Sequence, residues 1–226
     1  MSRILRAAGA AALTLVLFVP ASASAEHWSA TDDARDVHGG LYDPEPAPCG
    51  TFTELDSTAE TNTDITDLVV RHTRRSVLVA VRFRDLKSRK DQFASLYLRT
   101  PNGSWWLDVE RFHQGGRART DTFLAEEPEY PDDTGECGEI GYDSIEVSCR
   151  VAERVSVADD VMQVAIPRKC LHNPRWLRVG VDSNGGVQGD PDHPIYALLS
   201  DEWAGGTVLT PWQISYGPRI RAVDGK

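Results

Sequence analysis

Several short stretches of the chain alternate between apolar and polar positions, which is typical of strands that bury one face. The clearest stretch is Val77–Arg84, in which every second residue from Val77 to Phe83 is Val or Phe. A second β-branched stretch, Ile65–His72, precedes it and is joined to it by a short polar turn. The two stretches together predict a β-hairpin.

The same pattern predicts further strands and very little helix. Pro101-Asn102-Gly103 is a turn sequence, because proline presets φ while asparagine and glycine tolerate positive φ. No stretch of helix length after residue 25 has helical periodicity, and 171–174 is expected to form one helical turn. The further strands are expected at Phe93–Arg99, Ser104–Phe112, Ser144–Val151, Val161–Ile166, Trp176–Val181 and Trp212–Tyr216, with 144–151 and 161–166 forming a third hairpin.

Many short strands separated by turns predict an all-β fold, an antiparallel β-sandwich of jelly-roll-like type. No repeat or break in composition divides the chain after its N-terminal segment, so residues 26–226 are expected to form a single domain. Residues 26–60 are rich in proline and polar residues, and we expect them to be loosely ordered.

The N-terminal segment has the features of a secretory signal peptide. Arg3 and Arg6 precede an apolar run from Ala7 to Val19, and small residues suited to cleavage follow up to Ala25. The apolar run is shorter than the roughly 20 residues that span a bilayer. The sequence therefore predicts a signal peptide at residues 1–25 and a secreted, extracellular product with no membrane insertion after cleavage.

The four cysteines all follow the predicted signal peptide, which favours two disulfides in an exported protein. Three pairings are possible. Cys137 and Cys149 are close enough in sequence to close a loop, whereas Cys149 and Cys170 flank the third predicted hairpin. We prefer Cys149–Cys170 together with Cys49–Cys137.

Charge excludes two classes of partner. The chain has 24 Lys and Arg against 34 Asp and Glu, a formal net charge of −10. A nucleic-acid-binding protein needs a basic surface to neutralise phosphates, and docking on anionic lipid needs one too. We therefore expect no nucleic-acid partner and no binding to anionic lipid.

Two blocks of sequence carry a resemblance to known proteins. Residues 64–86 and the run Ile166-Pro167-Arg168-Lys169-Cys170-Leu171, with the Asn173–Gly180 segment after it, resemble small, uncharacterised exported β-sandwich proteins of actinobacteria. The layout is more distantly similar to DOMON domains and to family-nine carbohydrate-binding modules. The resemblance implies a sandwich fold, a secreted location and a cysteine pair that brackets a hairpin. Haem, which some DOMON domains bind through Met and His, is not expected, because Met162 is the only methionine after the signal peptide.

Trp105 and Trp106 must point to opposite faces of their strand. Trp105 belongs to the apolar face and is expected in the core. Trp106 shares the other face with Asp108, Glu110 and Phe112, and aromatic rings beside carboxylates suit a glycan. The alternative is that this face is covered by the acidic 126–143 segment and serves packing.

A candidate calcium site follows the last long strand. Asp182, Asn184, Asp190 and Asp192 place oxygen ligands around a glycine-rich turn, as calcium requires. Asp33 and Asp36 join this site if the N-terminal segment folds back. The same residues are also common in turns that bind no ion.

No catalytic motif is present. The sequence has no Gly-x-Ser-x-Gly elbow, no His-Glu-x-x-His and no P-loop. We therefore expect no enzyme and no cofactor other than calcium. The leading hypothesis is a secreted, non-catalytic protein that binds an extracellular glycan; the alternatives are a structural or protein-interaction module and, more weakly, a glycan hydrolase that uses Asp108 and Glu110.

Overall fold

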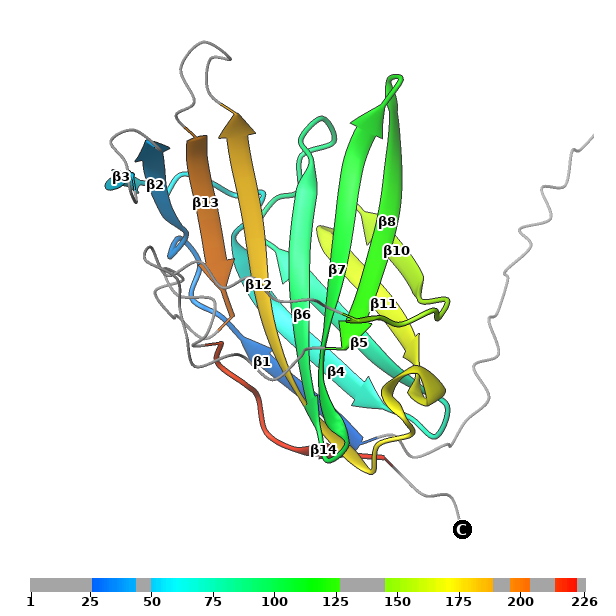
Figure 1. Cartoon of the computed structure of the whole chain (residues 1–226). Coiled ribbons are helices and arrows are strands. Elements are labelled where there is room, and N and C mark those ends of the chain that lie inside the picture. Colours follow the sequence, from blue (N-terminus) through cyan, green and yellow to red (C-terminus); the bar gives the residue numbers. More distant parts are fainter. Residues whose placement is uncertain (1–25, 44–49, 127–144, 189–195, 204–213, 223–226) are drawn as a thin grey trace, which may run out of the picture.

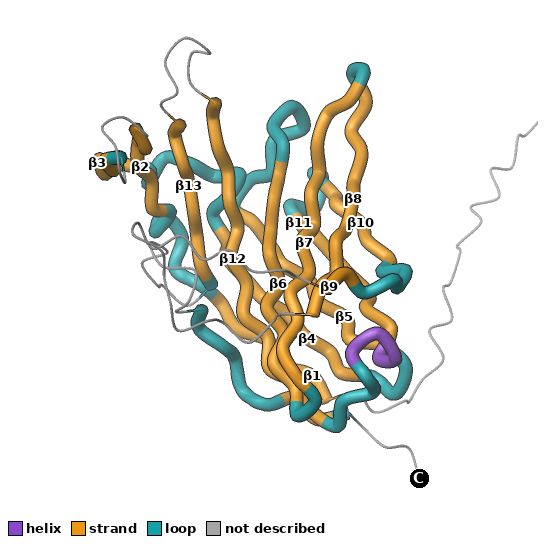
Figure 2. The backbone as a smooth tube through the Cα atoms, in the orientation of Figure 1, coloured by secondary structure: helices purple, strands orange, loops and turns teal. Residues whose placement is uncertain are grey.

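The computed structural model describes residues 26–43, 50–126, 145–188, 196–203 and 214–222. The signal peptide predicted at residues 1–25 lies outside the described residues. In the described part of the chain, strands dominate and the one helical turn is η1 (Arg168–Leu171), close to the turn expected at 171–174. Figure 2 shows this turn in purple among the strands, which are orange.

The strands form two antiparallel sheets that face each other (Figure 1). The first, which we call the five-stranded sheet, has the order β1 (Glu26–Thr31), β4 (Ile65–His72), β5 (Ser76–Phe83), β11 (Val161–Pro167), β10 (Ala152–Ser156). The second, which we call the nine-stranded sheet, has the order β3 (Thr51–Asp56), β2 (His38–Asp43), β13 (Tyr196–Glu202), β12 (Trp176–Gln188), β6 (Gln92–Thr100), β7 (Gly103–Gln114), β8 (Arg117–Glu126), β9 (Ile145–Glu146), with β14 (Ile220–Arg221) paired to β12. The predicted all-β antiparallel sandwich is confirmed.

One hydrophobic core lies between the two sheets. It takes the alternate residues of β4 and β5 from one sheet and those of β6, β7 and β12 from the other. Trp105, predicted to face the core, is fully buried there and makes a T-shaped contact with the ring of His172. Because side chains alternate along a strand, the residues between these core positions on β7 face away from the five-stranded sheet, and we call this face of the nine-stranded sheet the outer face.

Two of the predicted hairpins have the expected partners. β4 pairs with β5, and β6 pairs with β7 around the Pro101-Asn102-Gly103 turn. The glycine there has φ of +143°, a conformation that favours glycine. Local turn chemistry therefore set the register of the β6–β7 pair.

The third hairpin was predicted wrongly at its first strand. The partner of β11 is β10, residues 152–156, and not residues 144–151. Of that expected strand, Ile145 and Glu146 form β9 beside β8, and the residues from 147 to 151 form no strand. A strand was also predicted at 212–216, but residues 214–216 form no strand. The next strand is β14, which pairs with β12.

The N-terminal segment is more regular than predicted. Residues 26–60, expected to be loosely ordered, contribute β1, β2 and β3. β1 forms one edge of the five-stranded sheet, while β2 and β3 extend the nine-stranded sheet past β13. Figure 1 shows β2 and β3 at the top of the molecule, at one end of that sheet.

The Cys149–Cys170 disulfide is confirmed, with Cα atoms 6.0 Å apart. It ties the segment before β10 to η1, directly after β11, and so closes the open end of the β10–β11 pair. Cys49 and Cys137, predicted as the second pair, lie outside the described residues. Within the described ranges, none of the helical segments has the length and hydropathy to cross a membrane.

Candidate functional site

Four aspartates from three separate segments converge where the β1–β2 connection meets the sandwich. Asp32 and Asp36 lie in that connection, Asp64 immediately precedes β4, and Asp201 lies on β13. One carboxylate oxygen each from Asp32, Asp36 and Asp201 lies within 4.8 Å of the others. The charge of Asp36 raises the pKa of Asp64, and the charge of Asp64 raises the pKa of Asp201. We call these four residues the carboxylate cluster.

The register of β13 turns Asp201 into the sandwich. Asp201 lies opposite Ser183 of β12 and shares the inner face with it. Its side chain is buried, at 1% exposure, and its Oδ2 accepts a hydrogen bond of 2.5 Å from the backbone N–H of Ile65. This bond links β13 to the start of β4, so the two sheets meet at the cluster.

Asp64 is the most enclosed member of the cluster. It is fully buried, and its Oδ2 accepts the backbone N–H of Arg35 at 2.9 Å and lies 2.8 Å from the guanidinium of Arg84. Arg35 has φ of 76°, in the left-handed region, and this turn brings the β1–β2 connection back onto Asp64. Asp64 Oδ1 and Asp36 Oδ1 are both buried, and no hydrogen-bond donor reaches either of them.

Burial and mutual repulsion disfavour the ionisation of several carboxyl groups in the cluster at once. Burial, together with the charges of Asp36, Asp32 and Asp64, raises the pKa of Asp201 to about 8. Burial also raises the pKa of Asp64, although the Arg35 N–H and the Arg84 charge oppose the effect. Burial likewise raises the pKa of Asp36. The four carboxyl groups therefore resist full ionisation without a further positive charge nearby.

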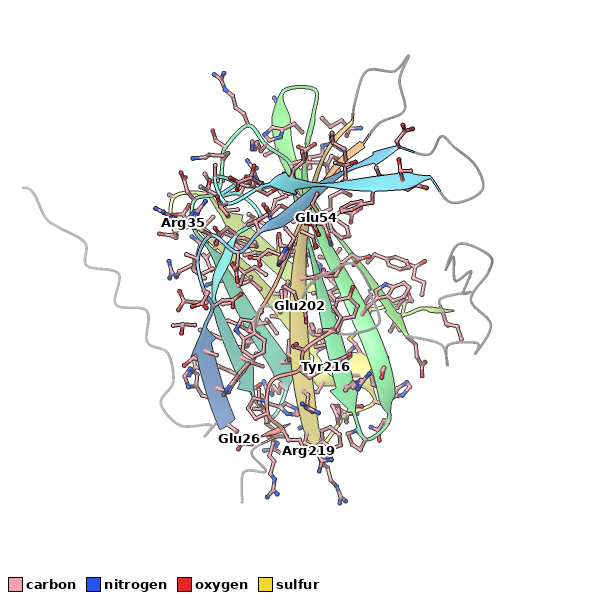
Figure 3. The ribbon with its side chains drawn as sticks, turned by 90° about the vertical axis from the view of Figure 1, so that its left-hand side faces the viewer. Glu26, Arg35, Glu54, Glu202, Tyr216 and Arg219 are labelled. Atoms are coloured by element: carbon pink, nitrogen blue, oxygen red, sulfur yellow. A yellow bond between two sulfur atoms is a disulfide. The ribbon has the colours of Figure 1, made fainter. Side chains whose placement is uncertain are left out.

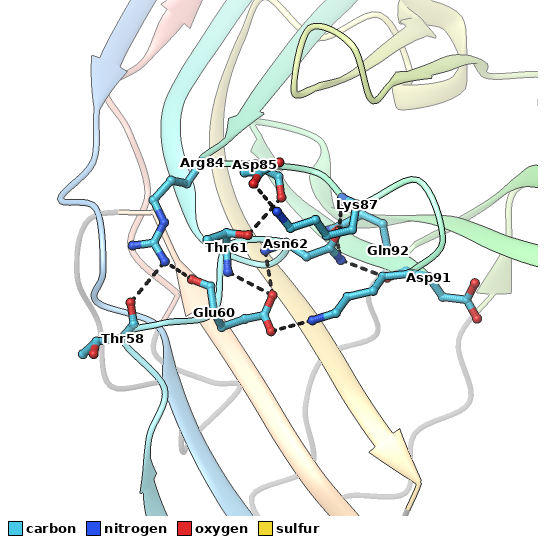
Figure 4. A network of polar contacts seen from close by, with 10 residues as sticks. Thr58, Glu60, Thr61, Asn62, Arg84, Asp85, Lys87, Asp91 and Gln92 are labelled. Atoms are coloured by element: carbon cyan, nitrogen blue, oxygen red, sulfur yellow. Dashed lines mark hydrogen bonds and ion pairs between the residues drawn. The ribbon is translucent and has the colours of Figure 1, made fainter.

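The positive charge of Arg84 is already shared with other groups. Its guanidinium donates to the backbone carbonyls of Thr58 and Glu60, as well as pairing with Asp64. Figure 4 shows the bonds from Arg84 to Thr58 and Glu60 within a polar network that also includes the Glu60–Lys90 ion pair and Asn62. The network fixes the connection between β3 and β4. Arg84 is therefore held beside Asp64 and away from the rest of the cluster.

A groove opens beside the cluster, and Asp36 lies in its wall. It has a volume of about 420 Å³, within the range of small-ligand sites. The β1–β2 connection, β2, β3 with the turn after it, and residues 184–185 and 199–200 line it. Phe52 and Leu55 of β3 contribute large apolar side chains that are 41% exposed. We call this the Phe52 groove; Figure 3 shows the labelled Arg35 and Glu54 at the same upper end of the molecule.

The Phe52 ring is positioned by a residue that has no side chain. A Cβ atom placed on Gly40 would lie 1.9 Å from Cζ of Phe52, so the ring occupies the space above the β2 backbone. Glu54 and Asp56 follow Phe52 on the same face of β3 and line the same groove. The hydroxyl and backbone N–H of Thr58 donate to Asp56 and lower the pKa of that carboxyl. Asp56 is therefore held as an ionised acceptor.

A second hollow of about 330 Å³ adjoins the Phe52 groove. The two share Asn184, Gly185 and Leu199, so they lie side by side at β12 and β13, and we call the two hollows together the cleft. Phe93 and Glu110 line the far end. Glu110 is thus the one member of the predicted glycan-binding face that the described residues place in the cleft.

The predicted glycan-binding residues do lie on one face of β7, which is the outer face of the nine-stranded sheet. Trp106 and Phe112 are only partly exposed there, whereas Glu110 is exposed. Asp108 accepts a hydrogen bond of 2.6 Å from the hydroxyl of Ser95, and burial raises the pKa of its carboxyl. Asp108 is thereby engaged within the protein, and the most exposed aromatic ring beside carboxylates is Phe52 rather than Trp106.

The predicted calcium residues are only partly within the described residues, since Asp190 and Asp192 lie outside them. Asp182 and Asn184 are neighbours on the outer face, and the Asn184 amide donates to Asp182 at 3.3 Å. The Tyr97 hydroxyl also donates to Asp182. Asp36, which the sequence tied to this site, instead lies with Asp201, whose side chain points to the opposite face of the sheet. Asp33 is exposed on the same connection.

Comparisons of the chain with protein-family models, with curated proteins and with solved structures give no match. The similarity to DOMON domains and to family-nine carbohydrate-binding modules therefore stays a prediction.

Sequence reasoning missed Phe52, Asp64 and Asp201. Phe52 lies in a segment that was expected to be loosely ordered. The two aspartates stand in ordinary strand contexts, and only the pairing of β13 with β12 brings Asp201 to the start of β4. The sequence pointed to Asp36, together with Asp33, but not to Asp32, Asp64 or Asp201 as its partners.

Proposed function

We propose that this chain is a secreted, non-catalytic binding protein that takes an extracellular glycan in the cleft that runs from Phe52 to Glu110. The observation that carries the proposal is the exposed Phe52 ring, held over Gly40 and flanked by carboxylates in a groove of about 420 Å³. The Cys149–Cys170 disulfide supports an oxidising location outside the cytoplasm.

The chemistry of the cleft matches that of a sugar chain. The apolar C–H face of a pyranose ring packs on an aromatic ring, while its hydroxyl groups donate to carboxylates. Phe52 supplies the ring, and Glu54 and Asp56 supply acceptors on the same strand face. Glu110 supplies a further acceptor at the far end. A cleft made of two adjoining hollows suits a chain of sugars better than a single compact ligand.

The carboxyl groups near the cleft favour binding over hydrolysis. A glycosidase needs a protonated acid and a second carboxylate on either side of the scissile bond. Asp56 is exposed and has a lowered pKa, so it is ionised and unsuited to act as the acid. Asp201 has a raised pKa, but it is buried and bonded to the Ile65 N–H, so it does not reach a ligand in the cleft.

The test is a pull-down of the oxidised protein on cellulose, chitin and peptidoglycan, with Phe52→Ala beside it. Phe123→Ala is the matched control, because Phe123 is a similarly exposed phenylalanine on the outer face of β8. We expect binding to at least one polymer, lost in Phe52→Ala and retained in Phe123→Ala. Circular dichroism of each variant confirms that it is folded.

Three results would overturn the proposal. Failure to bind any of the polymers would favour the protein-interaction alternative, for which β3, exposed along its whole length at the sheet edge, is the evident surface. Loss of binding in Phe123→Ala or Trp106→Ala, with Phe52→Ala unaffected, would move the site to the β7–β8 face. Release of soluble sugars during the incubation would show a hydrolase.

A further inference from the structure

We propose that Asp32, Asp36 and Asp201, with Asp64 buried beside them, form a binding site for a divalent cation, with calcium as the preferred ion. The site differs from the calcium loop that the sequence predicts around Asp182. It also stands independently of the glycan proposal, because it rests on the carboxylate cluster alone.

Geometry is the first support. Oxygens of Asp32, Asp36 and Asp201 lie within 4.8 Å of one another, which is the spacing of ligands around one ion. They come from the connection between β1 and β2 and from the end of β13. Clusters of exposed acids are common on protein surfaces, but Asp201 is 1% exposed and Asp64 is 0% exposed.

Unpaired buried oxygens are the second and independent support. Asp64 Oδ1 belongs to a fully buried side chain and has no hydrogen-bond donor, although the Oδ2 atom of the same carboxylate has two partners. Asp36 Oδ1 is buried and without a donor as well. Buried acceptors are almost always paired, and leaving one unpaired costs free energy, more so when the group is charged. A cation coordinated by Asp36 and lying close to Asp64 would offset that cost.

Charge balance points the same way. Arg84 and Arg35 act on Asp64, and His38 acts on Asp36. The backbone N–H groups of Ile65 and Arg35 donate to Asp201 Oδ2 and Asp64 Oδ2. Three aspartate charges act on Asp201, and a divalent cation would offset their repulsion.

The ligand set selects the ion. All the side-chain ligands are carboxylate oxygens, with no histidine or cysteine among them, which disfavours zinc. Magnesium requires near-ideal octahedral geometry and keeps much of its water. Calcium accepts six to eight oxygens in irregular arrangements, and backbone carbonyls or water complete its shell. Ligands drawn from two separate segments, the β1–β2 connection and β13, fit calcium best.

A bound ion would join three parts of the fold. It would tie the β1–β2 connection, through Asp32 and Asp36, to Asp201 of β13, which is itself bonded to the start of β4. Asp36 also lies in the wall of the Phe52 groove, so the ion would hold that wall in place. Calcium is therefore expected to stabilise the folded chain, because it binds the folded state and not the unfolded one.

The experiment is calorimetric titration of the EDTA-treated, desalted protein with calcium chloride and, separately, with magnesium chloride. Thermal unfolding is followed in parallel. We expect a single calcium site, a melting temperature that rises with calcium concentration, and weaker binding of magnesium. In Asp36→Asn we expect calcium affinity to fall at least about tenfold, the lower end of the loss seen for changes around a metal site.

Two matched variants keep the result interpretable. Asp33→Asn removes an exposed carboxylate from the same connection and should bind calcium as the unaltered protein does. Asp182→Asn tests the site that the sequence predicted. Absence of calcium binding in the unaltered protein would overturn the proposal, as would unchanged affinity in a folded Asp36→Asn or a loss confined to Asp182→Asn.

Discussion

Trp28 and Trp203 pack edge to face, with ring centroids 5.0 Å apart and planes at 89°. Trp28 lies on β1 of the five-stranded sheet, and Trp203 directly follows β13 of the nine-stranded sheet. Gly217 packs against the Trp28 ring, and a Cβ there would lie 2.5 Å from it. The two rings therefore join the sheets on the side where the carboxylate cluster lies.

Trp203→Ala should lower the free energy of unfolding by about 3–5 kcal/mol, the usual loss when a buried tryptophan is truncated. Trp203 is buried and belongs to the hydrophobic core, so its truncation would leave a cavity between the two sheets. Urea denaturation followed by circular dichroism measures the loss. The exposed Phe123→Ala is the control and should cost far less; equal losses in the two variants would contradict the role given to Trp203.

The disulfide gives a second stability prediction. Cys149 and Cys170 are 21 positions apart, and closing a loop of that size stabilises a protein by about 3 kcal/mol through the entropy of the unfolded chain. The double variant Cys149→Ala, Cys170→Ala should lose about this amount in urea denaturation under oxidising conditions. An unchanged denaturation midpoint would show that the β10–β11 end is held by packing alone.

The strands that sequence predicted well are those with one buried face. β4 and β5 alternate clearly because each lies between neighbours and covers the core. β10 and β3 escaped prediction because they are edge strands whose residues are mostly or wholly exposed, which leaves no alternation to detect. β2 was not predicted because it contains Gly39 and Gly40, and glycine has low strand propensity.

The candidate site was less predictable than the fold for a physical reason. Trp105 and Trp106 could be assigned to opposite faces, because alternation is a local property. Asp64 and Asp201 come together through the pairing of strands that are far apart in sequence. A local sequence pattern carries no information about that pairing. Phe52 is useful as a platform only because Gly40 leaves space beneath it, and that pairing is also non-local.

Asp182 makes stability depend on pH. Burial raises the pKa of Asp182 from 3.8 to about 7, with the Asp108 charge adding to the effect and the Asn184 and Tyr97 hydrogen bonds opposing it. Between these values the folded state binds more protons than the unfolded state. The stabilising contribution is therefore complete below about pH 4 and is lost as the pH rises through about 7.

Asp182→Asn should flatten this dependence, because the neutral amide has no charge to bury. Its free energy of unfolding, relative to the unaltered protein, is expected to rise steadily between pH 4 and pH 8. Urea denaturation at several pH values in EDTA measures the trend without any contribution from metal. Asp121→Asn removes an exposed acid from the same face and should leave the slope as it was; an unchanged slope in Asp182→Asn would contradict the argument.

Gly40→Ala tests the aromatic platform from beneath. The new Cβ would lie 1.9 Å from Cζ of Phe52, and the far end of that flexible side chain must swing away from the β2 backbone. If Phe52 stacks on a sugar, binding to the polymer identified by the pull-down should weaken about 3- to 10-fold, the value of one aromatic stacking contact. Leu41→Ala is the control, because Leu41 is the next residue on β2, is exposed, and points to the opposite face. Binding that is unchanged in Gly40→Ala but weaker in Leu41→Ala would show that the ligand contacts the other face of β2, and the Phe52 ring would then serve only to cover the strand.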